Sequence, residues 1–147
     1  MEQVRRVSVA LSAKQHEISE AAERLLAERD ALRARSEALG MRLFEMLAQA
    51  QAGEAVRVVA CDALAPSQAR KAAGHLAQGA RYGLVLIPRE EGWSFALCSQ
   101  AEDVRPAVKA LCAAFGGKGG GPKDMAQGVL GSGSEAEIRE RLVGLTQ

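Results

Sequence analysis

The sequence is poor in aromatic residues, since its 147 residues include one Trp, one Tyr and three Phe. A hydrophobic core therefore has to be built from Leu, Val, Ala and Ile, and the hydrophobic content of 48% is ordinary for a globular protein. An excess of one charge is also lacking, because 19 Lys and Arg stand against 18 Asp and Glu. This balance excludes a global field that draws the chain to nucleic acid or to an anionic membrane, so any anion-binding surface has to be local.

Histidine and cysteine are scarce as well. His16 and His75 are the only histidines and lie far apart, while Cys61, Cys98 and Cys112 lack metal-ligand spacing. We interpret the cysteines as buried free thiols in a reducing cytoplasm. No Ser, Thr or Cys is paired with a histidine in a catalytic pattern, and no apolar run reaches the roughly 18 residues that span a bilayer. We expect a cytoplasmic protein that is not an enzyme, with no metal, no cofactor and no membrane partner.

The first third of the chain predicts a long helix. A repeat of seven residues favours packing of one helix face against another helix. A coiled coil needs a second row of apolar residues, four positions after the first row. Here that second row is poor, because it contains Arg29. Ser12 and Gln15 form a capping-box pattern, so we expect a short helix from Val4 to about Leu11 and a longer one from about residue 13 to residue 49. The repeating residues are Val4, Leu11, Ile18, Leu25, Leu32, Leu39 and Met46.

Two domains are expected from this pattern. Residues 1–53 form a helical arm, which is a candidate coiled-coil and dimerisation element; an intramolecular hairpin or an arm lying on the domain is the alternative. Residues 54–147 alternate between strand and helix patterns, which predicts an α/β fold with a small mixed sheet and helices packed on it. We expect strands at 56–60, 82–88 and 93–98, a helix at 68–78 capped by Ser67, a helix with Pro106 in its first turn, an edge strand at 125–130, and a last helix opened by a Ser134–Glu137 capping box.

The most unusual segment is GGKGGGPKDMAQG, residues 116–128. A Walker-type phosphate loop is excluded, because Pro122 stands where that motif needs Lys followed by Ser or Thr. A dinucleotide fingerprint is excluded too, since these glycines do not open a helix. Two interpretations remain. Gly116 can end the preceding helix and begin a wide turn, or consecutive glycines can turn backbone N–H groups inward as an anion-binding nest that Lys118 and Lys123 flank with positive charge.

The run of residues 116–121, followed by Asp124-Met-Ala-Gln, resembles the signature of the glycine-rich C-terminal domain of alanyl-tRNA synthetases and of freestanding alanyl-tRNA editing proteins. The same domain class closes the DHH-type phosphoesterases. Residues 11–33 resemble the linker helix that precedes this domain, so almost the whole chain is covered. The order Pro122 then Lys123 departs from the family, which places a basic residue directly after the glycines.

The resemblance implies an accessory module that holds tRNA, at its outer elbow and with preference for alanine tRNA, and that assists dimerisation. The zinc site of the editing domains and the histidine beside the glycines of the phosphoesterases both lack counterparts here. A purely structural oligomerisation module and the substrate-binding domain of a DHH-type phosphoesterase are the alternatives. Arg81, Arg89 and Lys109 are further candidate contacts on charge alone. The expected nucleic-acid-binding residues are Gly116, Gly117, Lys118, Gly119, Gly120, Gly121, Lys123, Asp124 and Gln127.

Overall fold

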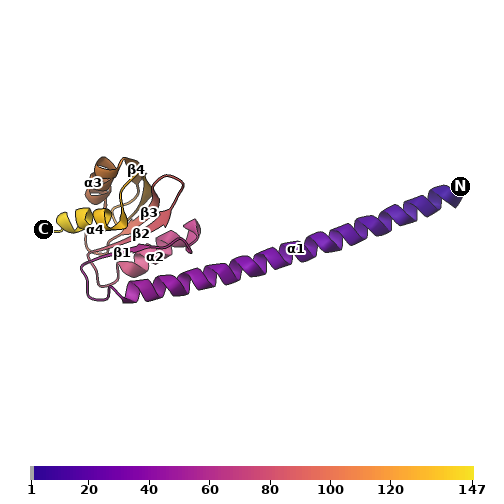
Figure 1. The fold of residues 1–147 in the computed structure, drawn as a ribbon, viewed down its shortest axis with the longest axis horizontal. Helices are drawn as coiled ribbons and strands as arrows, with labels where there is room; N and C mark the ends of the chain where they lie inside the picture. Colours follow the sequence, from indigo (N-terminus) through magenta and orange to yellow (C-terminus); the bar gives the residue numbers. More distant parts are fainter. Residues whose placement is uncertain (1) are drawn as a thin grey trace. The chain divides into compact units, whose positions relative to one another are not determined.

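The computed structural model describes residues 2–147, and its first element is a single long helix, α1 (Glu2–Gln49) (Figure 1). The predicted break near Leu11 is wrong, because the helix continues through Ser12 and Gln15. Residues 2–39 contain no Gly or Pro that would interrupt the helix. The backbone N–H groups that a cap at Ser12 would satisfy can therefore bond to carbonyls of the preceding turn.

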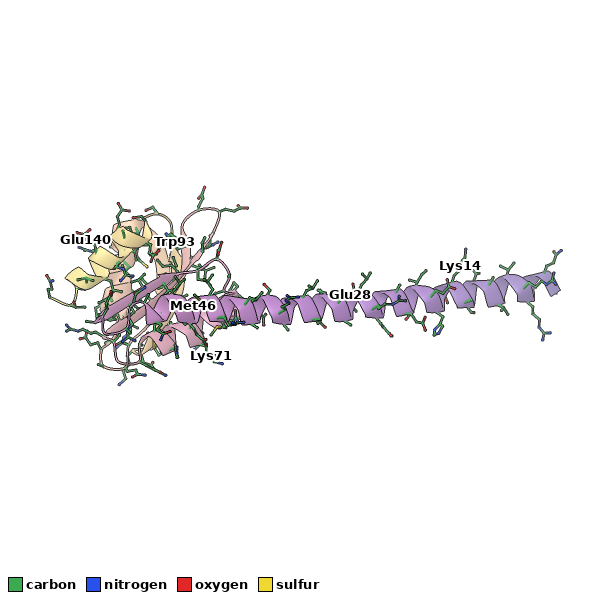
Figure 2. The ribbon with its side chains drawn as sticks, turned by 60° about the horizontal axis from the view of Figure 1, so that its bottom comes forward. Lys14, Glu28, Met46, Lys71, Trp93 and Glu140 are labelled. Carbon is green, nitrogen blue, oxygen red and sulfur yellow. The ribbon has the colours of Figure 1, made fainter. Side chains whose placement is uncertain are left out.

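The chain divides into two compact units, Met1–Ser36 and Glu37–Gln147. In the first unit, side chains such as Lys14 and Glu28 point away from the helix axis (Figure 2). The repeating apolar residues Leu11, Ile18, Leu25 and Leu32 are exposed, with 56–68% of their surface accessible. An exposed apolar row at this spacing is suited to packing against another helix.

The second unit contains a five-stranded mixed sheet of order β1-β2-β3-β5-β4. β1 and β2 are parallel, whereas the other neighbours are antiparallel. The predicted mixed sheet and its first three strands are confirmed. All of β2 except Pro88 is buried, as expected for a strand that is covered on both faces. The strands are β1 (Val56–Ala60), β2 (Tyr82–Pro88), β3 (Trp93–Cys98), β4 (Gly117–Gly120) and β5 (Met125–Leu130).

Helices cover both faces of this sheet (Figure 1). α3 (Arg105–Phe115) and α4 (Glu135–Gly144) pack on one face, where Leu84 lies in the core. α2 (Ala69–Leu76) and the last turns of α1 pack on the other face, where Val85 lies in the same core cluster as Phe44. Leu84 and Val85 are neighbours on β2 and point to opposite faces, so one strand contributes to two cores. Phe44 is completely buried, which makes the end of α1 part of the second unit.

Two of the predicted helix ends are confirmed. Ser134 caps α4 in a capping box: its N–H donates to Glu137 Oε2 at 2.7 Å, and Glu137 N–H donates to Ser134 Oγ at 3.3 Å. Gly116 ends α3 in the left-handed region at φ 64°, with its N–H bonded to the Cys112 carbonyl. A residue without Cβ adopts this conformation at little cost.

The predicted cap at Ser67 is wrong. Pro66 begins a short 3₁₀ helix, η1 (Pro66–Gln68), and Ser67 lies within it. The side chain of Gln68 folds back instead, so that Oε1 accepts the N–H of Ala65 at 3.0 Å. Proline favours the first position of a helical turn because its φ is already fixed, which moves the start of the helix ahead of Ser67.

The glycine segment is a strand rather than a solvent-open loop. β4 pairs antiparallel with β5 over Gly117–Gly120, so β4 is the edge strand and β5, the expected edge, is second in the sheet. Phe95 of β3, Gly128 of β5 and Gly119 of β4 are cross-strand neighbours in one row. A Cβ on Gly119 would stand 2.7 Å from Cζ of Phe95 and 3.2 Å from Cγ1 of Val108. The aromatic ring therefore occupies the room that a side chain on Gly119 would need.

We predict that Gly119→Ala destabilises the protein by about 1–3 kcal/mol, because the added methyl overpacks the contact with Phe95. Gly120→Ala is the matched control: a Cβ there meets no atom within 4 Å, and the change should be neutral or slightly stabilising. Urea unfolding followed by the fluorescence of the single tryptophan, Trp93, measures both variants. Equal effects of the two substitutions would contradict this account of the glycine row.

Candidate nucleic-acid interface

The hydrogen-bonding pattern of β4 determines which of its backbone groups are free. Gly131 N–H donates to the carbonyl of Gly116, its directly opposite partner, at 2.6 Å. Hydrogen-bonded pairs alternate along an antiparallel ladder, so Lys118 and Gly120 bond to β5 while Gly117 and Gly119 turn their N–H and C=O groups outward. No strand of residues 2–147 pairs with this side of β4. The predicted inward-facing nest is thus wrong: the free amides alternate with free carbonyls along an open edge.

A groove of about 830 Å³ lies between this open edge and α3; we call it the α3–β4 groove. Pro106, Val108 and Cys112 give it an apolar wall, and the glycine main chain forms the opposite wall. Burial raises the pKa of the Cys112 thiol, which favours its protonated form. The residues that line the groove are Asp103, Arg105, Pro106, Val108, Lys109, Cys112 and Gly117–Gly121.

Positive charge surrounds the groove and is only partly compensated. Arg105 Nη2 lies 2.5 Å from Asp103 Oδ2, and the bonds from Arg105 hold the pKa of that carboxyl down at about 2. Lys123 adds a smaller favourable charge to the same carboxylate. Among the described residues, neither Lys109 nor Lys118 nor Lys123 has a carboxylate within 4.0 Å. The groove therefore presents lysine charges that an anion can neutralise.

The predicted site residues do not converge on one concavity. Alternation along the strands places Lys118 and Gln127 on the face opposite α3, whereas Gly117, Gly119 and Gly121 belong to the groove side. Lys123 and Asp124 form the turn between β4 and β5. Their carbonyls accept the N–H groups of Val104 and Ser99, at 2.8 and 3.1 Å, which ties the turn to the start of α3. Asp124 orders the turn through its main chain.

Sequence reasoning missed Arg105 as part of the site and named Lys109 on charge alone. These residues are four apart on α3 and share the helix face that lines the groove. The spacing of these two residues was visible in the sequence. The sequence did not show that this face of α3 lies beside β4. Arg89 lies elsewhere, in a second concavity of about 600 Å³ beside Glu90 and Glu91.

A hydrogen-bonded cluster fixes the loop that leads into α3. Glu102 accepts the Tyr82 hydroxyl at 2.8 Å and pairs with Arg81, which also donates to the carbonyl of Thr146 at 2.6 Å. The Ser99 hydroxyl donates to the carbonyl of Arg81 at 2.6 Å. Arg81, one of the candidate contacts, is therefore occupied within the protein. Burial and the bond to Glu102 raise the pKa of Tyr82 to about 12.

Neither a metal-binding cluster nor a membrane span is found in the part of the chain that the structure describes. Among the described side chains, no group of three or more His, Cys, Asp and Glu is placed to hold a metal ion. No helix in that part of the chain is both long and apolar enough to cross a bilayer. His16 pairs with Glu20 at 3.3 Å, and His75 contacts the Phe44 ring edge-on, so each histidine has a local packing or charge partner.

Comparison with protein-family models and with curated proteins gave no match. Among solved structures, the chain is similar to the C-Ala domain of alanyl-tRNA synthetase from Aquifex aeolicus, with 18% identity and a TM-score of 0.51. The match covers 61% of this chain and 86% of that one. The chain has the fold of the C-Ala domain. The fold expected from the resemblance is confirmed.

Two larger proteins of known structure also match this chain. RecJ from Thermus thermophilus, in complex with Mn²⁺, matches 81% of this chain at 17% identity and a TM-score of 0.58. An exonuclease RecJ bound to manganese matches 84% at 17% identity and a TM-score of 0.60. This chain spans 18% and 32% of those two proteins.

We predict that the protein loses stability as the pH rises from about 10 to about 12. The unfolded chain releases the Tyr82 proton at its ordinary pKa of 10.0, whereas the folded chain retains it up to about 12. Tyr82 is the only tyrosine, so phenolate absorbance reads its pKa directly. Tyr82→Phe should remove this part of the alkaline slope, and a phenolate titration at the ordinary value would contradict the Tyr82–Glu102 contact.

Proposed function

We propose that this chain is a non-catalytic, tRNA-binding accessory module of an alanyl-tRNA editing protein or an alanyl-tRNA synthetase. The observation that carries the proposal is the fold it shares with the C-Ala domain of a synthetase. Contacts with RNA phosphates need positive charge and close approach to the backbone rather than recognition of bases. Lysines without a close carboxylate provide the charge, and the adjacent glycines allow the close approach. Alanine tRNA is the proposed ligand and the cytoplasm the proposed location.

RNA contact is proposed at two places along the β4–β5 hairpin. Lys123 stands at the turn, and Lys118 projects from the face of β4 opposite the α3–β4 groove. Lys109 adds charge from α3. The glycines, with Asp124 and Gln127, let a sugar–phosphate backbone come close to the hairpin. These contacts position RNA without reading its sequence.

A second candidate has its own support. The two RecJ structures cover more of this chain than the C-Ala domain does. We therefore propose as the alternative that the chain is the nucleic-acid-gripping part of a phosphoesterase that acts on short single strands. Preference for short phosphorylated oligonucleotides over folded tRNA would favour this alternative over the tRNA module.

We predict that Lys118→Ala with Lys123→Ala weakens tRNA binding and reduces the slope of log K against log salt by about two, since each phosphate that is no longer neutralised removes roughly 0.9 from the slope. Lys71→Ala is the matched control, because Lys71 is exposed on α2, beside Met41 and Glu45 of α1 and outside the β4–β5 hairpin (Figure 2). Affinity is measured by filter binding or anisotropy across a salt titration. An unchanged slope in the double variant, or an equal reduction in the control, would refute the lysine contacts.

We further propose that residues 1–36 pair with the same residues of a second copy through the exposed row of Ile18 and Leu25. Ile18→Glu with Leu25→Glu should convert a dimer into a monomer in sedimentation. Ala27→Glu is the control, since residue 27 lies about 200° around the helix from Leu25 and faces away from the row. A monomeric unaltered chain, or a dimer that survives the double substitution, counts against helix pairing.

A further inference from the structure

The open edge of β4 and the apolar wall of α3 together form a docking surface whose main-chain acceptors RNA phosphate contacts do not use. Gly117 and Gly119 each present an outward N–H donor and an outward C=O acceptor. A polyanion takes up only the donors, whereas an extended peptide takes up both kinds of group. An added strand is therefore the occupant whose hydrogen bonds match this edge.

The walls of the groove favour a peptide over a single-stranded nucleic acid. Proteins that bind single strands stack bases on aromatic side chains. None of the residues that line the groove is aromatic, and Asp103 lies among them. Pro106, Val108 and Cys112 offer instead an apolar wall for small aliphatic side chains. The volume of about 830 Å³ accepts a strand as long as β4, which spans about 13 Å at 3.3 Å per residue.

Charge identifies the partner further. Lys109 lines the groove, and Lys123 lies at its end, where its charge acts favourably on Asp103. Among the described residues, neither lysine has a carboxylate within 4.0 Å. Pairing β4 with β4 of a second copy would bring these cations together with those of the other chain, which opposes a continuous sheet across a dimer. An acidic peptide neutralises them.

We infer that the α3–β4 groove binds an extended acidic peptide segment of a partner protein, which adds to Gly117–Gly120 as a sixth strand. Main-chain bonds to Gly117 and Gly119 hold the segment. Of its side chains that face α3, the small apolar ones pack on the apolar wall and the acidic ones approach Lys109 and Lys123. The peptide site shares Lys109 and Lys123 with the proposed RNA contacts. It leaves the Lys118 side chain, which lies on the opposite face of β4, available to RNA.

The test uses the full chain and an acetylated, amidated peptide, Asp-Ser-Val-Ser-Val-Ser-Asp, whose Asp and Val side chains all lie on one face of an extended strand. In the free protein, amide hydrogen exchange should be slow at Lys118 and Gly120 and fast at Gly117 and Gly119. The peptide should slow exchange at Gly117 and Gly119. Lys109→Glu with Lys123→Glu should weaken peptide binding about tenfold, as expected from the reversal of two exposed charge pairs, while Lys71→Glu should leave it unchanged.

Matched probes separate the outcomes. The same peptide with Lys in place of both Asp residues should not bind, and N-methylation of the acidic peptide on the amides that face β4 should abolish binding. No change of exchange at Gly117 and Gly119 with millimolar acidic peptide would overturn the inference. Slowing by a short poly-uridine strand instead of the peptide would assign the groove to RNA, and slowing by protein concentration alone would assign it to a second copy. Either result would overturn the peptide proposal, and neither would test the Lys118 contact with tRNA.

Discussion

The Phe95 ring packs along a row of two glycines, Gly128 and Gly119, which are neighbours on the adjacent strands β5 and β4. This packing sets the geometry of the half of the sheet that carries the candidate site. Because Gly128 and Gly119 carry no side chains, the ring fills the row across β3, β5 and β4, and Val108 of α3 lies close to the edge strand. A larger residue at Gly119 would push either the ring or the helix away. This contact therefore sets how closely β4 approaches α3 at Gly119, beside the groove.

Much of the fold could be predicted from local signals. Three elements were predicted correctly because a few neighbouring residues determine them. They are the apolar strand β2, the left-handed Gly116 that ends α3, and the Ser134–Glu137 capping box of α4. The break expected at Ser12 failed, because a capping pattern is effective only where the helix backbone is interrupted and nothing interrupts it there. Ser67 failed for a related reason, since the neighbouring Pro66 begins the helical turn first.

The candidate site was predicted in part. The glycines and lysines were visible in the sequence as a motif. A run rich in glycine has low strand propensity, so the sequence did not predict a strand there. The pairing of this run with β5 involves Phe95, which lies more than twenty positions earlier in the chain. The pairing of β4 with β5 differs from the expected geometry in two ways. Half of the β4 amides donate hydrogen bonds within the sheet, and Lys118 and Gln127 lie on the face away from α3. The contribution of Arg105 and Lys109 arises only when α3 lies beside β4, which no local pattern encodes.

The burial of Phe44 and the close approach of Gly40 to the Ala63 carbonyl bind the last turns of α1 to the sheet. A Cβ at Gly40 would stand only 2.1 Å from that oxygen, so this part of the helix has little freedom to detach. A protease cut that removes helix from the sheet without opening the core therefore has to fall before Glu37, well inside α1.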